Sequence, residues 1–143
     1  MRHLLLSCTL LALIANLGCG GTQCTEIDCD STLEVDYGEV VVNEPYELTI
    51  NPGGTSVTVT CLANSPDAEP LPDWLDCDAG GFVITGELAD TTTTMNVAVV
   101  PLSTEEAVIP NALVALNVDE LIEPNGPDCD PRCVVRRGSV EDS

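Results

Sequence analysis

Residues 46–61, YELTINPGGTSVTVTC, decide the fold of this 143-residue chain. Both halves of the stretch carry apolar side chains at every second position, with polar side chains between them. A period of two places the apolar side chains on one face of an extended strand, and β-branched residues favour that conformation. The Asn-Pro-Gly-Gly run at 51–54 is typical of a tight turn. The stretch therefore predicts a β-hairpin with strands at 46–50 and 57–61.

Further short runs of alternating or β-branched residues stand between Pro and Gly signals along the chain. They predict strands at 33–37, 39–42, 81–86, 93–100 and 112–118. Ser103 and Glu106 have the spacing of a helix capping box, but we assign residues 103–107 to a loop. The sequence thus predicts an all-β fold over 33–123: a single small antiparallel β-sandwich, immunoglobulin-like or related, with about seven strands and disulfide staples.

The beginning of the chain has the layout of a secretory signal peptide, with Arg2 before an apolar run at 4–17. The run is shorter than the roughly 20 apolar residues of a membrane-spanning helix. Leu-Gly-Cys-Gly at 17–20 resembles a bacterial lipobox, although Asn16 stands where that motif usually has leucine. We predict a lipoprotein-type signal peptide at 1–18 and a lipid on Cys19. Ordinary cleavage after residue 20 is the alternative.

Six cysteines remain after either cleavage, an even number that suits disulfides in an oxidising compartment. Cys61 ends a predicted strand and Cys77 precedes another, so a bridge between them would fix the loop that joins them, which contains Pro66, Pro70 and Pro72. The other four lie near the two ends of the mature chain: Cys24, Cys29, Cys129 and Cys133. They pair locally or cross-link the ends, because six cysteines allow 15 connectivities and the sequence does not choose.

The two ends of the mature chain are expected to differ from the sandwich. We interpret residues 19–32 as a tether that contains Cys24 and Cys29, and residues 124–143 as a Pro/Cys-rich tail. The prolines and the Asn-Gly pair at 124–133 preclude regular structure, so disulfides must order that segment. We expect residues 134–143 to be frayed. Zinc bound by Cys129 and Cys133 is disfavoured, because no histidine accompanies them and the chain is exported.

Charge and composition exclude several function classes. The formal net charge is −20 and lysine is absent, so the surface repels the phosphates of nucleic acids. The sole histidine, His3, lies in the predicted signal peptide. The mature chain therefore lacks a Ser-His-Asp triad, a histidine metal ligand and a catalytic or phosphate-binding lysine. A glycosidase-like carboxylate pair remains, but one Trp and one Phe offer little surface for stacking a sugar. We predict no catalytic residues.

One acidic loop has partial metal-site spacing. Residues 76–87 match an EF-hand calcium loop at its first, third, sixth and twelfth positions, where Asp76, Asp78, Gly81 and Glu87 stand. The fifth position is Gly80 instead of Asp or Asn, and no flanking helices are predicted. Asp76, Asp78 and Glu87 are thus candidate calcium ligands. The alternative is a turn with solvated carboxylates that leads into a strand. No other cofactor is predicted.

The C-terminal motif Pro-Asn-Gly-Pro-x-Cys-x-Pro-x-Cys at 124–133, with a cysteine pair after a signal peptide, resembles a group of uncharacterised secreted lipoproteins of myxobacteria and related deltaproteobacteria. The resemblance implies an envelope address and a sandwich domain, and no activity.

These features favour a non-catalytic, lipid-anchored cell-envelope protein with a structural or protein-interaction role. We expect it at the outer membrane or cell surface, held by its N-terminal lipid, with an envelope protein as a possible partner and no nucleic acid. A soluble periplasmic or secreted protein is the alternative address. A calcium-dependent binding or adhesion module is the second hypothesis, and a carboxylate-based glycoside hydrolase is the third.

Overall fold

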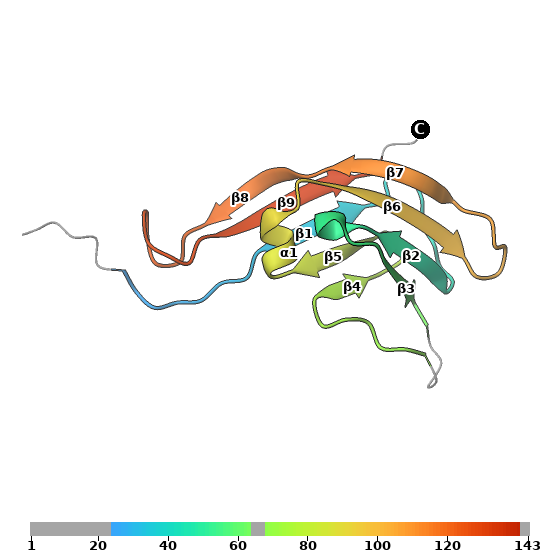
Figure 1. The fold of residues 1–143 in the computed structure, drawn as a ribbon, viewed down its shortest axis with the longest axis horizontal. Helices are drawn as coiled ribbons and strands as arrows, with labels where there is room; N and C mark the ends of the chain where they lie inside the picture. The colour runs from blue at the N-terminus through green and yellow to red at the C-terminus, as the bar shows by residue number, and fades with distance from the viewer. Residues whose placement is uncertain (1–23, 64–67, 141–143) are drawn as a thin grey trace, which may run out of the picture.

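The computed structural model describes residues 24–63 and 68–140. The signal peptide and Cys19 lie outside these residues. The described part of the chain contains nine strands, one short helix and one 3-10 turn (Figure 1): β1(Thr32–Asp36), β2(Tyr46–Ile50), η1(Pro52–Gly54), β3(Val57–Cys61), β4(Leu75–Cys77), β5(Gly81–Thr85), α1(Glu87–Thr91), β6(Thr94–Pro101), β7(Ile109–Ala115), β8(Asn117–Ile122) and β9(Cys133–Ser139). The all-β prediction is confirmed.

The strands form two sheets that pack as a sandwich. One sheet has the order β4-β5-β1-β9-β8 and the other the order β3-β2-β6-β7. Alternate residues of the strands point inward, so that Leu33 and Val35 of β1 lie against a core shared with Leu48 and Ile50 of β2. Pairing is antiparallel as predicted except between β1 and β9, which run parallel. The first and the last strand thus lie side by side at the centre of one sheet.

The predicted hairpin is confirmed residue by residue. β2 and β3 pair antiparallel from Tyr46 opposite Cys61 to Ile50 opposite Val57. η1 supplies the turn, with Gly53 and Gly54 at φ of +61° and +86°. Both are conformations that glycine adopts without steric cost.

Two strand predictions need correction. Residues 39–42 form no strand, because Gly38 turns the chain at a φ of +68° and the Val42 amide donates to the Ala79 carbonyl oxygen instead of to a neighbouring strand. The run at 112–118 is broken at Leu116, whose amide donates to the Thr93 carbonyl oxygen. The chain changes sheet there, since β7 pairs with β6 and β8 pairs with β9.

The expectation of a frayed C-terminal end is wrong for residues 134–139. These residues belong to β9, which pairs with β1 on one side and β8 on the other. The buried side chains of Cys133, Val135 and Val140 hold the segment against the domain. The segment is therefore an ordered strand although it contains two arginines at 136–137, because its backbone is hydrogen-bonded to a strand on each side.

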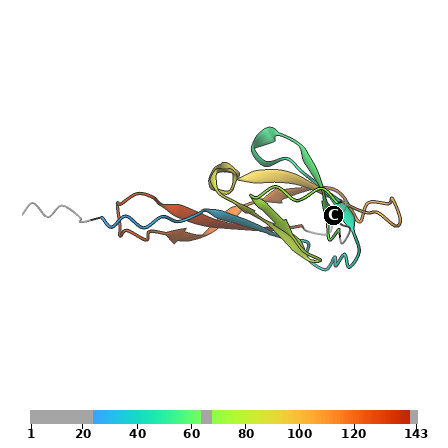
Figure 2. The same cartoon turned by 90° about the horizontal axis from the view of Figure 1, so that it is seen from below.

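Two parts of the chain, residues 24–31 and the β8–β9 hairpin, extend from one end of the sandwich and lie beside each other (Figures 1 and 2). The β6–β7 connection lies at the opposite end. Residues 117–121 of β8 are all exposed, so neither face of this strand is covered by the other sheet. We call residues 24–31 and 123–133 together the terminal clamp.

Within the described ranges no helix is long and apolar enough to span a membrane.

Candidate functional site: the terminal clamp

Two disulfides join the two ends of the described chain. Cys24 bonds to Cys129 and Cys29 to Cys133, with sequence separations of 105 and 104 residues. Of the alternatives left open by the sequence, cross-linking of the ends is the one found. The third bridge, between Cys61 and Cys77, is the predicted one and ties β3 at the edge of one sheet to β4 at the edge of the other.

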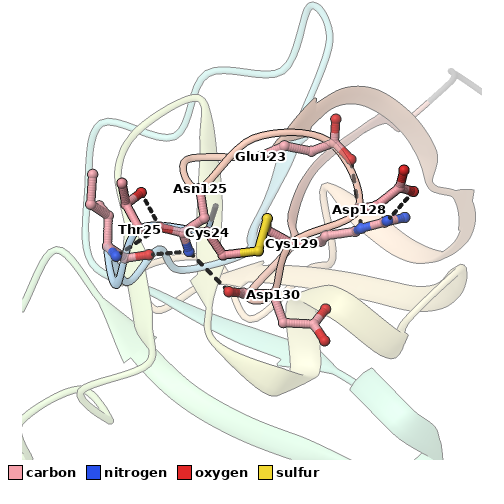
Figure 3. Close-up of a disulfide and its surroundings, with 9 residues drawn as sticks. Cys24, Thr25, Glu123, Asn125, Asp128, Cys129 and Asp130 are labelled. Carbon is pink, nitrogen blue, oxygen red and sulfur yellow. Dashed lines mark hydrogen bonds and ion pairs between the residues drawn. A yellow bond between two sulfur atoms is a disulfide. The ribbon is translucent and has the colours of Figure 1, made fainter. Parts of the chain in front are cut away.

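Asn125 is the centre of the clamp (Figure 3). Its Oδ1 accepts hydrogen bonds from the Thr25 hydroxyl at 2.7 Å and from the Ile27 amide at 2.8 Å. Its Nδ2 donates to the carbonyl oxygens of Ile27 at 2.9 Å and Asp130 at 3.0 Å. The side chain is only 5% exposed, and all four of its hydrogen-bonding positions are used. Asn125 therefore fixes the N-terminal segment on the C-terminal loop through both backbone groups of Ile27.

Ser31 continues the clamp into the sheet. Its hydroxyl accepts a hydrogen bond from the Val134 amide at 3.1 Å, and its carbonyl oxygen accepts one from the Gly86 amide at 2.9 Å. Because Val134 lies in β9 and Ser31 immediately precedes β1, the clamp is continuous with the two central strands of the five-stranded sheet.

All three arginines of the described residues are engaged within the molecule. Arg132 lies 3.0 Å from Asp128 and 3.5 Å from Glu123 in the clamp loop. Arg136 donates to the backbone carbonyl oxygens of residues 89 and 90, in the last turn of α1, where a cation is favourable. Arg137 bridges strands β1 and β8 by pairing with two carboxylates, those of Glu34 and Asp119. These three arginines thus secure the C-terminal part of the described chain.

A hollow of about 470 Å³ lies on the outer face of the five-stranded sheet. Its lining includes Glu34, Asp36, Asp76, Asp78 and Arg137. Glu34 and Asp36 alternate with the buried side chains of β1, which places them on the face opposite the core. Four carboxylates and one guanidinium make this hollow acidic, in keeping with the surface of the whole chain.

The three candidate calcium ligands do not converge. Residues 81–85 form the extended strand β5 instead of a curled loop, so Asp78 and Glu87 lie at its opposite ends, separated by roughly 13 Å of strand. Asp76 lies on β4. In the described residues no group of three or more His, Cys, Asp or Glu side chains is arranged to hold a metal ion.

Asp78 has a structural role that explains its position. Its Oδ1 accepts hydrogen bonds from the amides of Gly80 and Gly81 at 2.7 and 2.9 Å, which closes the turn between β4 and β5. Its carbonyl oxygen accepts a hydrogen bond from the Tyr46 hydroxyl at 2.6 Å. The Tyr37 hydroxyl lies 3.2 Å from that of Tyr46 and must be the donor to it, because the Tyr46 proton is already used. The alternative of a turn leading into a strand is therefore the one found.

The tyrosine pair gives a matched test of this network. Tyr46→Phe leaves the Asp78 carbonyl oxygen and the Tyr37 hydroxyl without their partner, so we expect a loss of about 2–3 kcal/mol of unfolding free energy. Tyr37→Phe keeps the bond from Tyr46 to Asp78 and should cost roughly 1 kcal/mol. Urea denaturation of both variants measures the difference, and equal losses would contradict the proposed direction of the two hydrogen bonds.

The same pair makes the fold sensitive to alkali. Burial raises the pKa of Tyr37, and also that of Tyr46, above the ordinary value of 10.0. The unfolded chain therefore loses tyrosine protons at a lower pH than the folded chain does. The contribution of the pair to stability is complete below pH 10.0 and falls as the pH rises further.

The sequence did not identify Asn125 or Ser31 as clamp residues, or Arg136 as a residue that binds the end of α1. The Asn-Gly pair at 125–126 carries the signature of a turn, which it forms, but nothing local shows that the amide side chain binds a segment 98 residues away. Comparisons with protein-family models, with curated proteins and with solved structures found no match for this chain.

Proposed function

We propose that this chain is a non-catalytic, lipid-anchored domain of the bacterial cell envelope with a structural or protein-interaction role. Its three disulfides indicate an oxidising, extracytoplasmic compartment. The finer proposal, a lipid on Cys19 that holds the domain at the outer membrane or cell surface, is supported by the signal-peptide pattern and by the resemblance of the C-terminal motif to secreted lipoproteins.

The terminal clamp is the observation that carries the proposal. A fully extended chain spans at most about 17 Å between residues 19 and 24, so a lipid on Cys19 would keep the clamp close to the bilayer. Force on the anchor would pass through Cys24–Cys129 and Cys29–Cys133 into the C-terminal loop. Covalent bonds would therefore carry load that hydrogen bonds along residues 24–31 would otherwise have to resist.

The charge distribution supports a binding role over catalysis. Every arginine of the described chain is held by carboxylates or backbone carbonyl oxygens in the same molecule. The remaining acidic surface, including the hollow on the five-stranded sheet, suits a partner with a basic surface, because charge complementarity speeds encounter and selects partners. An envelope protein of that character is the partner we propose.

Substitution of Cys19 tests the anchor. We expect Cys19→Ala to abolish palmitate labelling and to move the protein from the membrane fraction to the soluble fraction. Cys8→Ala is the matched control, because it replaces another cysteine within the first 20 residues, and it should leave labelling unchanged. Globomycin, which blocks lipoprotein signal peptidase, should cause the precursor to accumulate. Retained labelling of Cys19→Ala, or a mature N-terminus at Gly21, would show that the anchor is absent.

A further inference from the structure

Asn125-Gly126 is the only Asn-Gly pair in the sequence. In an unconstrained Asn-Gly pair, the glycine amide nitrogen attacks the Cγ atom of the asparagine side chain, because no glycine side chain hinders the approach. A new C–N bond forms, ammonia leaves, and the product is a five-membered cyclic imide. Water then opens the imide at either carbonyl group and gives aspartate or isoaspartate. Water is the only co-reactant.

We propose that the terminal clamp prevents deamidation of Asn125, and that reduction of the clamp disulfides by a thiol, which is itself oxidised to a disulfide, allows the reaction. The inference does not depend on lipidation of Cys19, because it rests only on contacts within residues 24–133.

Both reacting groups are restrained in the folded chain. The Gly126 amide, which would be the nucleophile, donates a hydrogen bond to the Glu123 carbonyl oxygen at 3.0 Å. The Asn125 amide, which holds the electrophilic carbon, makes four hydrogen bonds of 2.7–3.0 Å and is buried (Figure 3). Attack requires rotation of this side chain and release of the glycine amide. Those hydrogen bonds must break together before the imide can form.

The disulfides control this opening because they position the partners of Asn125. Thr25 and Ile27 lie between Cys24 and Cys29, in a segment that forms no helix or strand. Three of the four hydrogen bonds of Asn125 go to this segment. Once the Cys24–Cys129 bridge is lost, separation of this segment from the loop becomes a local opening that costs far less than global unfolding.

Deamidation would make the opening permanent. The aspartate or isoaspartate product has no N–H group to donate to the carbonyl oxygens of Ile27 and Asp130. It would also place a negative charge beside those oxygens, in a buried position where an unpaired charge is unfavourable. Reoxidation of the cysteines would then not restore the hydrogen bonds of Asn125. The modified side chain would remain as a lasting mark of the earlier reduction.

The rate of deamidation tests the proposal. The oxidised mature protein and the same protein, reduced with dithiothreitol and alkylated, are incubated at mildly alkaline pH and digested. Mass spectrometry then follows the conversion of the Asn125 amide to acid. We expect Asn125 to deamidate about tenfold faster or more in the reduced chain, and the exposed Asn43, which precedes Glu44, to show little change. Equal rates at Asn125 in the two states would overturn the proposal.

Paired variants separate local opening from unfolding. Removing the adjacent bridge with Cys24→Ala and Cys129→Ala should accelerate deamidation, whereas removing the distant bridge with Cys61→Ala and Cys77→Ala should not. Equal acceleration in both pairs, with folding verified by circular dichroism, would overturn the proposal.

If either pair fails to fold, Thr25→Val decides the question. This variant keeps all three disulfides and removes one hydrogen bond of Asn125. Deamidation faster than in the parent supports the proposal, and an unchanged rate overturns it.

Discussion

A chain that lacks both clamp disulfides is expected to lose about 8 kcal/mol of unfolding free energy, more than the two single losses add up to. Either bridge alone closes a loop of about one hundred residues, which in the chain-entropy model stabilises the fold by roughly 4.7 kcal/mol. With one bridge in place, the second closes a ring of only about ten residues and adds roughly 3 kcal/mol. The expected coupling is thus about 2 kcal/mol.

Urea denaturation of alanine variants measures these terms. The pairs Cys24→Ala with Cys129→Ala and Cys29→Ala with Cys133→Ala should each keep a cooperative transition. The fourfold variant should be largely unfolded, because a domain of this size has only about 5–15 kcal/mol in total. Loss of Cys61–Cys77, whose separation is 16 residues, should cost roughly 3 kcal/mol whether or not the clamp is intact. Additive losses for the two clamp bridges would contradict this account.

The parts of the fold that the sequence predicts are those set by local pattern. The hairpin at 46–61 follows from alternation on both sides of a Pro-Gly-Gly turn, and its register agrees with that pattern. The bridge between Cys61 and Cys77 is short in sequence and follows from the ends of neighbouring strands. β4 and α1 have only three and five residues, so a periodic pattern of apolar residues cannot be told from chance in them.

The parts that the sequence does not predict depend on contacts between distant residues. β9 follows a Pro-rich loop and contains Arg136 and Arg137, so it resembles an exposed end until β1 and β8 are known to flank it. The clamp depends on the hydrogen bonds between Asn125 and Ile27, and no local sequence pattern predicts a contact between residues so far apart in the chain. The calcium-like spacing at 76–87 arises because turns and calcium-binding loops both use Asp and Gly, but the extended strand β5 keeps the two ends of the motif apart.

Gly81→Ala is expected to destabilise the domain by about 3 kcal/mol or more. Gly81 begins β5 opposite Asp36 of β1, and a Cβ atom there would overlap the carbonyl oxygen of Val35. This oxygen belongs to the backbone of a central strand, so no side-chain rotation can relieve the clash. β5 would have to move away from β1, which disturbs the pairing of both strands at the rim of the acidic hollow.

The adjacent glycine provides the matched control. A Cβ atom on Gly80 would come no closer than 3.7 Å to the Asp78 carboxylate, an ordinary contact. Gly80→Ala should therefore change the unfolding free energy by less than about 1 kcal/mol, and the reduced entropy of the unfolded chain favours a small gain. Thermal and urea denaturation of both variants distinguish the two positions. Equal destabilisation would mean that the turn at 78–81, and not the approach of β5 to β1, is what restricts these residues to glycine.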